Sequence, residues 1–134
     1  MSGNLYRRAA LAACVPGLLL LAACSGTPYE DSHRGLPESV APGDTGEPFA
    51  VWTDHPDRFA VVLYGSSSCP PRPESLSLEG PDTIILTLED PPSGPCTADL
   101  APTTYDFAAP AGLQAGADVT IRMGASTLTL SAPS

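Results

Sequence analysis

Short groups of apolar residues alternate with polar ones from residue 47 to the C-terminus of the chain. The pattern is clearest at residues 82–90, where Ile84, Leu86 and Leu88 occupy every second position. Alternation with a period of two is typical of a β-strand that buries one face. The sequence therefore predicts a strand in this segment.

Six further segments favour strands, five of them by the same alternation. Residues 58–65 form a continuous apolar run instead, which predicts a central strand buried on both faces. The alternating segments are 47–53, 74–80, 103–110, 117–123 and 126–132. Gly124-Ala125, between the last two, predicts a two-residue hairpin in which glycine supplies a positive φ.

About seven short strands in residues 47–134 predict an all-β domain, a small antiparallel β-sandwich of immunoglobulin-like type. A small β-barrel is the alternative. The sixteen prolines agree with this class, because proline disfavours long helices.

The N-terminus has the order of a secretory signal peptide. Arg7 and Arg8 are followed by an apolar stretch from Ala9 to Ala23, which ends in small residues before Cys24. The stretch of about 15 residues is shorter than the ~20 that a helix needs to cross a bilayer. Residues 1–23 are therefore predicted to be a signal peptide.

Leu21-Ala22-Ala23-Cys24 resembles the lipobox of bacterial lipoproteins. The resemblance implies cleavage before Cys24 and attachment of acyl chains, such as palmitate, to that cysteine. The same letters occur at Leu11–Cys14, but the five residues between Arg8 and Cys14 are too few for the apolar region. A membrane-spanning anchor, or an ordinary signal peptide that leaves Cys24 free, are the alternatives.

Residues 24–46 are polar and rich in proline and glycine, without strand or helix periodicity. This composition predicts the lipidated cysteine followed by a flexible linker. The β-sandwich domain is expected to span residues 47–134.

Cys69 and Cys96 are the two cysteines left in the predicted domain. Because exported proteins keep disulfides, we expect these two to be paired. A bridge that closes a loop of 27 positions contributes roughly 3–4 kcal/mol in the chain-entropy treatment. Two unpaired structural thiols are the alternative, and two cysteines alone supply too few ligands for a metal.

Gly65–Cys69 has three serines after a predicted buried strand, which resembles a nucleophile elbow. The pattern fails because Cys69 replaces its second glycine and two prolines follow. A base is also missing, since His33 falls in the predicted linker and His55 precedes the strand that the serines follow. A hydrolase using Ser66, Ser67 or Ser68 with His55 is therefore an alternative, and a polar turn is favoured.

Asp54, His55 and Asp57 form a second cluster, whose carboxylates and imidazole suit a metal ion. Adjacent loop residues rarely converge on one ion without distant ligands. A solvated turn is the favoured interpretation, and metal binding is an alternative. No cofactor is predicted.

Cleavage before Cys24 would leave four arginines against fifteen acidic residues, a net charge of −11. So negative a surface repels phosphate backbones, which argues against nucleic acid as a partner. It also repels anionic headgroups, so attachment to the membrane would depend on the lipid of Cys24.

The segments Gly65–Pro71 and Cys96–Pro110 are similar to parts of small uncharacterised actinobacterial lipoproteins, a resemblance that implies no activity. The predicted anchor and linker, together with the lack of a catalytic constellation in the sequence, predict a non-enzymatic binding or scaffolding domain on the extracytoplasmic face of the cell membrane. An envelope protein or glycan is the expected partner.

Overall fold

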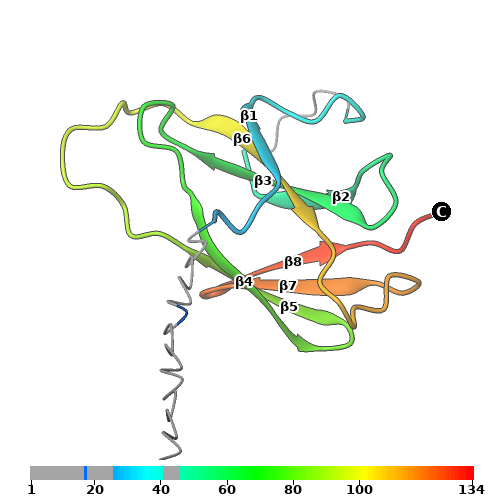
Figure 1. Cartoon of the computed structure of the whole chain (residues 1–134). Helices are drawn as coiled ribbons and strands as arrows, with labels where there is room; N and C mark the ends of the chain where they lie inside the picture. Colours follow the sequence, from blue (N-terminus) through cyan, green and yellow to red (C-terminus); the bar gives the residue numbers. More distant parts are fainter. Residues whose placement is uncertain (1–16, 18–25, 41–45) are drawn as a thin grey trace, which may run out of the picture.

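Every regular element in the part of the chain that the structure describes, residues 17, 26–40 and 46–134, is a β-strand (Figure 1). The structure is a computed structural model. None of the described residues belongs to a helix long and apolar enough to cross a membrane. The strands are β1 (Asp31–Arg34), β2 (Phe49–Trp52), β3 (Arg58–Gly65), β4 (Pro73–Gly80), β5 (Thr83–Leu88), β6 (Ala101–Ala108), β7 (Val119–Met123) and β8 (Ser126–Leu130).

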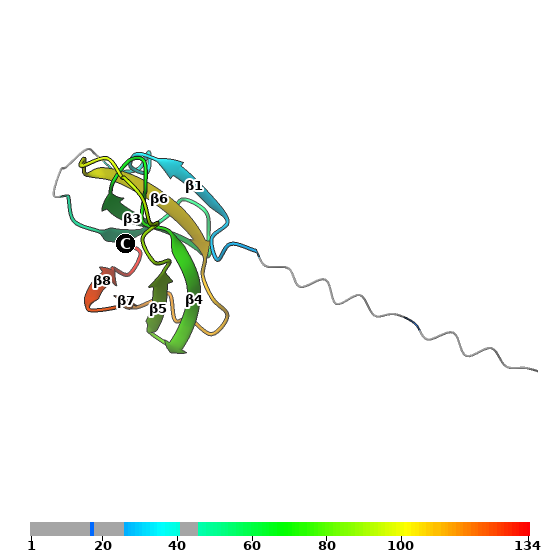
Figure 2. The same ribbon diagram turned by 90° about the vertical axis from the view of Figure 1, so that its left-hand side faces the viewer.

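The strands form two four-stranded sheets, in the orders β1-β6-β3-β2 and β4-β5-β7-β8. Figure 2 shows the sheets as two layers, which confirms the predicted sandwich. The expectation of purely antiparallel pairing is wrong at one place, because β5 and β7 are parallel. Between these strands the chain crosses to the other sheet as β6, so β7 can return in the same direction as β5.

The core lies between the layers, where alternate residues of β2–β8 point inward. On β3, Phe59, Val61 and Leu63 belong to the core, and Phe59 stacks on Phe107 of β6 with ring centroids 5.4 Å apart. Ala60 and Val62 on the opposite face of β3 are also fully buried. The prediction that residues 58–65 form a strand buried on both faces is therefore confirmed.

The seven predicted strands correspond to β2–β8, and the structure adds β1. This strand falls inside residues 24–46, so the interpretation of that range as a flexible linker is wrong at Asp31–Arg34. All four residues of β1 are exposed, and β1 is held by backbone pairing with β6. A strand that buries no side chain leaves no apolar alternation in the sequence.

The hairpin between β7 and β8 has the predicted form. Met123 pairs with Ser126, so Gly124-Ala125 is the connecting turn. Gly124 has a φ of 54°, a conformation that residues with a Cβ disfavour.

The two edges of the sandwich differ. On one side β2 packs against β8 and closes the layers. On the other side the edge strands β1 and β4 stand apart, and a cavity lies between the sheets near them.

Candidate functional site: the open-edge cavity

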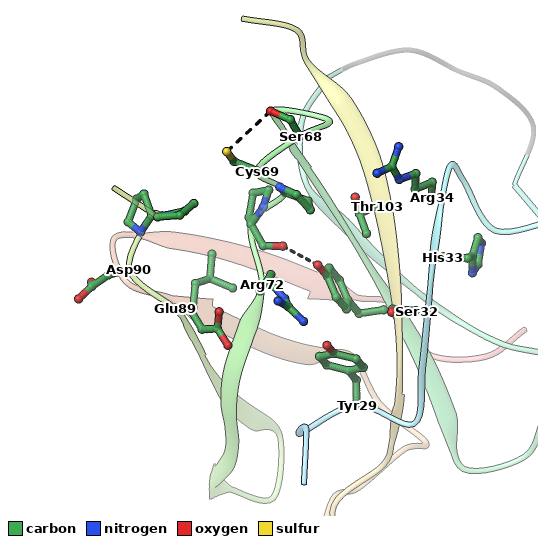
Figure 3. Close-up of a pocket in the computed structure, with 16 residues that line it drawn as sticks. Tyr29, Ser32, His33, Arg34, Ser68, Cys69, Arg72, Glu89, Asp90 and Thr103 are labelled. Carbon is green, nitrogen blue, oxygen red and sulfur yellow. Dashed lines mark hydrogen bonds between the residues drawn. The ribbon is translucent and has the colours of Figure 1, made fainter. Parts of the chain in front are cut away.

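The open-edge cavity has a volume of about 700 Å³ (Figure 3). Three parts of the chain line it: β1 and β6 on one side, the end of β5 and the residues after it on the other, and residues 68–72 before β4. A volume of this size lies within the ~300–1,000 Å³ range of small-molecule sites.

Strand register explains which side chains of β1 and β6 reach the cavity. Tyr105 points into the core, so Thr103, two positions earlier, lies on the same face. Ser32 pairs with Tyr105 and Arg34 pairs with Thr103, which brings both to this face. The exposed strand β1 therefore supplies a hydroxyl and a cation to the mouth of the cavity.

Two tyrosines form the inner part of the cavity. Tyr105 is only 3% exposed, and its hydroxyl donates a hydrogen bond to the carbonyl oxygen of Pro71, at 2.7 Å. Burial raises the pKa of Tyr105, and the nearby Tyr29 raises it further. The Tyr29 ring meets the Tyr105 ring edge-on, with centroids 4.9 Å apart. Tyr29 thus closes the core at this edge, although it precedes β1.

Arg72 stands opposite the tyrosines, next to Glu89. The backbone N–H of Glu89 donates to the carbonyl oxygen of Arg72 at 2.8 Å. This hydrogen bond joins the residue after β5 to the residue before β4. Hydrogen bonding to Tyr29 raises the pKa of Arg72 above its usual value, and the charges of Tyr29 and Glu89 add to this. Figure 3 shows the Arg72 side chain between Glu89 and Tyr29.

Within the described ranges, Arg34 and Arg72 have no carboxylate within ion-pair distance. Among described residues the structure contains one ion pair, between Arg122 and Glu79 at 3.2 Å, on the outer face of the other sheet. Both cavity arginines are exposed and so reach solvent at the mouth. Each guanidinium therefore lacks an ion-pair partner among the described residues, while that of Arg72 also hydrogen-bonds Tyr29.

The predicted disulfide is confirmed: Cys69 and Cys96 are bonded, with their Cα atoms 5.6 Å apart. The bridge fastens the long exposed loop between β5 and β6, residues 89–100, to the turn after β3. The turn itself is tight, because a Cβ at Gly65 would lie 2.6 Å from Cδ of Pro71. The bridge therefore fixes the rim of the cavity.

The three serines lie in the same turn as Cys69 and add hydrogen bonds to the loop that the disulfide fastens. Ser66 Oγ lies 2.8 Å from Thr97 Oγ1, and the Thr97 N–H donates to Ser68 Oγ at 2.9 Å. Asp99 accepts hydrogen bonds from the Ser67 backbone N–H, at 3.0 Å, and from the Thr97 hydroxyl. Hydrogen bonds from Ser67 and Thr97 lower the pKa of Asp99 well below its usual range.

The structure brings neither histidine to the serines, as the sequence predicts for His55. His55 precedes β3 and the serines follow it, so a strand of roughly 26 Å separates them, at ~3.3 Å per residue. His33 is on β1 rather than in a linker, and in Figure 3 its ring points away from Ser68.

Asp54, His55 and Asp57 form a turn between β2 and β3. The backbone N–H of Ala109 donates to the Asp57 carbonyl oxygen at 2.7 Å, and Asp57 has a φ of 64°. Within the described ranges no three His, Cys, Asp or Glu side chains are grouped to hold a metal ion. The structure therefore does not assemble the alternative metal site.

Sequence reasoning missed Tyr29, Arg34 and Arg72. The first two lie in the predicted linker, where an aromatic residue within a polar segment was the available signal. Cys14 and Cys24 lie outside the described residues.

Comparison with known proteins finds no matching family model, no matching curated protein and no matching solved structure. The function is therefore argued from the site.

Proposed function

We propose that this protein is a lipid-anchored binding protein on the extracytoplasmic face of the cell membrane, and that it binds its partner without catalysis in the open-edge cavity. The signal pattern of residues 1–23 and the lipobox at Cys24 support the anchor. The observation that carries the binding role is the cavity itself, with its buried tyrosine and its two exposed arginines.

The chemistry of the cavity suits recognition. Its inner part is apolar and aromatic, formed by Leu88, Tyr105 and Tyr29, while charged groups stand at the mouth. An apolar interior with a few fixed polar groups is the usual composition of a ligand site. The disulfide and the hydrogen bonds of Thr97 hold the rim in place before a ligand arrives, which lowers the entropy lost on binding.

The anchor is tested by labelling the full chain with a radioactive fatty acid in its native host. We expect Cys14→Ser to retain the label and Cys24→Ser to lose it. An unmodified Cys24 at the mature N-terminus, found by mass spectrometry, would show that the lipoprotein assignment is wrong.

The binding role is tested with a photo-crosslinking amino acid in the membrane-bound full chain. One variant carries it at Asp90, on the cavity rim, and the control carries it at Thr127 of β8. We expect a discrete adduct from position 90 that position 127 does not give. Adducts from both positions alike, or from neither, would contradict a binding site in the cavity.

The non-catalytic role is tested with a broad fluorophosphonate probe. Proton transfer from a serine requires a base at about 3 Å. The hydroxyls of these serines contact one another, Thr97 and Cys69, and the lowered pKa of Asp99, which accepts a hydrogen bond from Ser67, makes that carboxylate a weak base. We expect no labelling of Ser66, Ser67 or Ser68. Labelling that disappears in His55→Ala would support the hydrolase alternative.

A further inference from the structure

We propose that the open-edge cavity binds an acidic sugar, a unit that joins one anionic group to several hydroxyls. This inference rests on the proposed binding function and names its ligand class. The charges around the mouth, the shape of the two strand edges and the side chains inside the cavity favour this ligand class.

The arginines are distributed unevenly. The described residues contain four, and two of them, Arg34 and Arg72, line one cavity although they are far apart in the sequence. Acidic residues greatly outnumber arginines in the chain, so two guanidinium groups at one mouth, with no ion-pair partner among the described residues, are a local exception. Guanidinium groups bind carboxylates and phosphates through paired, charge-assisted hydrogen bonds.

The same mouth carries Glu89 and Asp90, which excludes a ligand that is anionic throughout. These carboxylates accept hydrogen bonds and repel a second negative charge. A ligand that fits both the arginines and the carboxylates has one localised anionic group for the former and neutral hydroxyl donors for the latter. An acidic sugar has both features.

The lining fits the body of a sugar ring. Ser32, Ser68 and Thr103 add hydroxyls that both donate and accept hydrogen bonds. The half-buried Tyr29, which packs edge-on against the buried Tyr105, supplies aromatic surface for the apolar face of a ring.

The strand edges next to the cavity argue against an extended peptide. On β1, which has four residues, the Ser32 N–H donates to its neighbour Asp31 at 2.8 Å. On β4, the pairing with β5 shifts register twice, between Pro73 and Ser75 and between Leu78 and Gly80. Short, self-bonded or bulged edges are poor templates for an added strand. A compact ligand between the sheets is therefore favoured.

The test is calorimetric titration of the detergent-solubilised, lipidated full chain with a trisaccharide that contains one galacturonic acid unit and two neutral units, with its methyl ester and with inorganic phosphate. We expect the acid to bind, and the neutral ester to bind at least about ten-fold more weakly, since a charge-assisted hydrogen bond is worth more than a neutral one. Added salt should weaken binding of the acid and leave that of the ester unchanged. Phosphate alone should not saturate the site.

Arg34→Gln and Arg72→Gln should each weaken binding of the acid trisaccharide about ten-fold. The matched control is Arg122→Gln, which removes the same charge on the outer face of the other sheet and should leave the affinity unchanged. Unchanged melting temperatures for the Arg34 and Arg72 variants separate lost binding from lost folding.

Three results would overturn the ligand class. Equal affinity for acid and ester would remove the role of the anion, and equal affinity for phosphate and trisaccharide would remove the role of the sugar. No binding of the trisaccharide, together with the specific photo-adduct at position 90, would show that the cavity binds another ligand. Absence of both would contradict the proposed function itself.

Discussion

The two edges of the sandwich have the same core behind them and are closed by different means. At the closed edge β2 packs against β8, and Ala50 and Leu130 of these strands belong to the core. At the open edge β1 and β4 stand apart, and Tyr29, a disulfide and a hydroxyl cluster hold the rim. Burial of side chains thus completes one edge, and local cross-links complete the other around a cavity.

A row of aromatic rings connects the two edges. Trp52 of β2 meets Phe59 at 6.0 Å, Phe59 stacks on Phe107, and Phe107 meets Tyr29 at 6.3 Å. Both edges therefore share one aromatic core, and the effect of a substitution at either edge is compared with the effect of disrupting that core.

The largest effect is expected when this row is broken in the middle. Phe107 is fully buried, so Phe107→Ala should lower the free energy of unfolding by about 3–5 kcal/mol, a large part of a small domain's stability. Urea denaturation measures the change. Leu100→Ala, at a side chain 65% exposed, should change it by less than about 0.5 kcal/mol. Equal effects of the two substitutions would contradict the core described here.

The next largest effect concerns the open edge alone. Cys69→Ser combined with Cys96→Ser should lower stability by roughly 3–4 kcal/mol, because the unfolded chain gains freedom. Hydrogen exchange should speed up first in residues 66–71 and 89–100, while β2 and β8 keep their protection. Non-reducing peptide mapping of the native protein should give one linked pair. Uniform loss of protection at both edges would show that the bridge does not act locally.

The closed edge was predictable because its strands bury one face. Segments such as 47–53 and 126–132 alternate apolar and polar residues, and the structure has β2 and β8 there. The Cys69–Cys96 pair was predictable because the other two cysteines fall in or next to the predicted signal peptide.

The open edge was not predictable in the same way. Asp31–Arg34 is paired through its backbone and buries no side chain, so its composition matches that of a linker. Arg34 and Arg72 line the same cavity only because β1 and the start of β4 flank one gap, which is a result of sheet order. Strand alternation specifies which face is buried, and it does not specify which edges remain open.

A smaller effect is expected at the floor of the cavity. Tyr105→Phe removes the hydrogen bond to Pro71 and should lower stability by about 1 kcal/mol at neutral pH. The folded pKa of Tyr105 is raised, so its contribution is complete below the unfolded value of about 10 and is lost as the pH rises through the folded value. Denaturation measured across alkaline pH, with tyrosinate absorbance, should show this loss in the native chain and a smaller one in Tyr105→Phe. The same alkaline profile for both proteins would show that Tyr105 is not the group responsible.

The smallest effect is expected at the exposed carboxylate of the rim. The folded pKa of Asp99 is lowered, so the stability that it contributes is present above its unfolded pKa of about 4 and is lost as the pH falls through the folded value. Acid should therefore release the Ser67 N–H and the Thr97 hydroxyl, and should loosen the open edge while β2 and β8 remain paired. Hydrogen exchange at Ser67, followed as the pH is lowered and corrected for its intrinsic pH dependence, measures the release. Asp99→Asn keeps an acceptor oxygen and removes the charge, so its exchange at Ser67 should be faster at neutral pH and should no longer respond to acid. A native protein whose Ser67 protection is the same across this pH range would contradict the assignment of Asp99 as the acceptor that holds the turn.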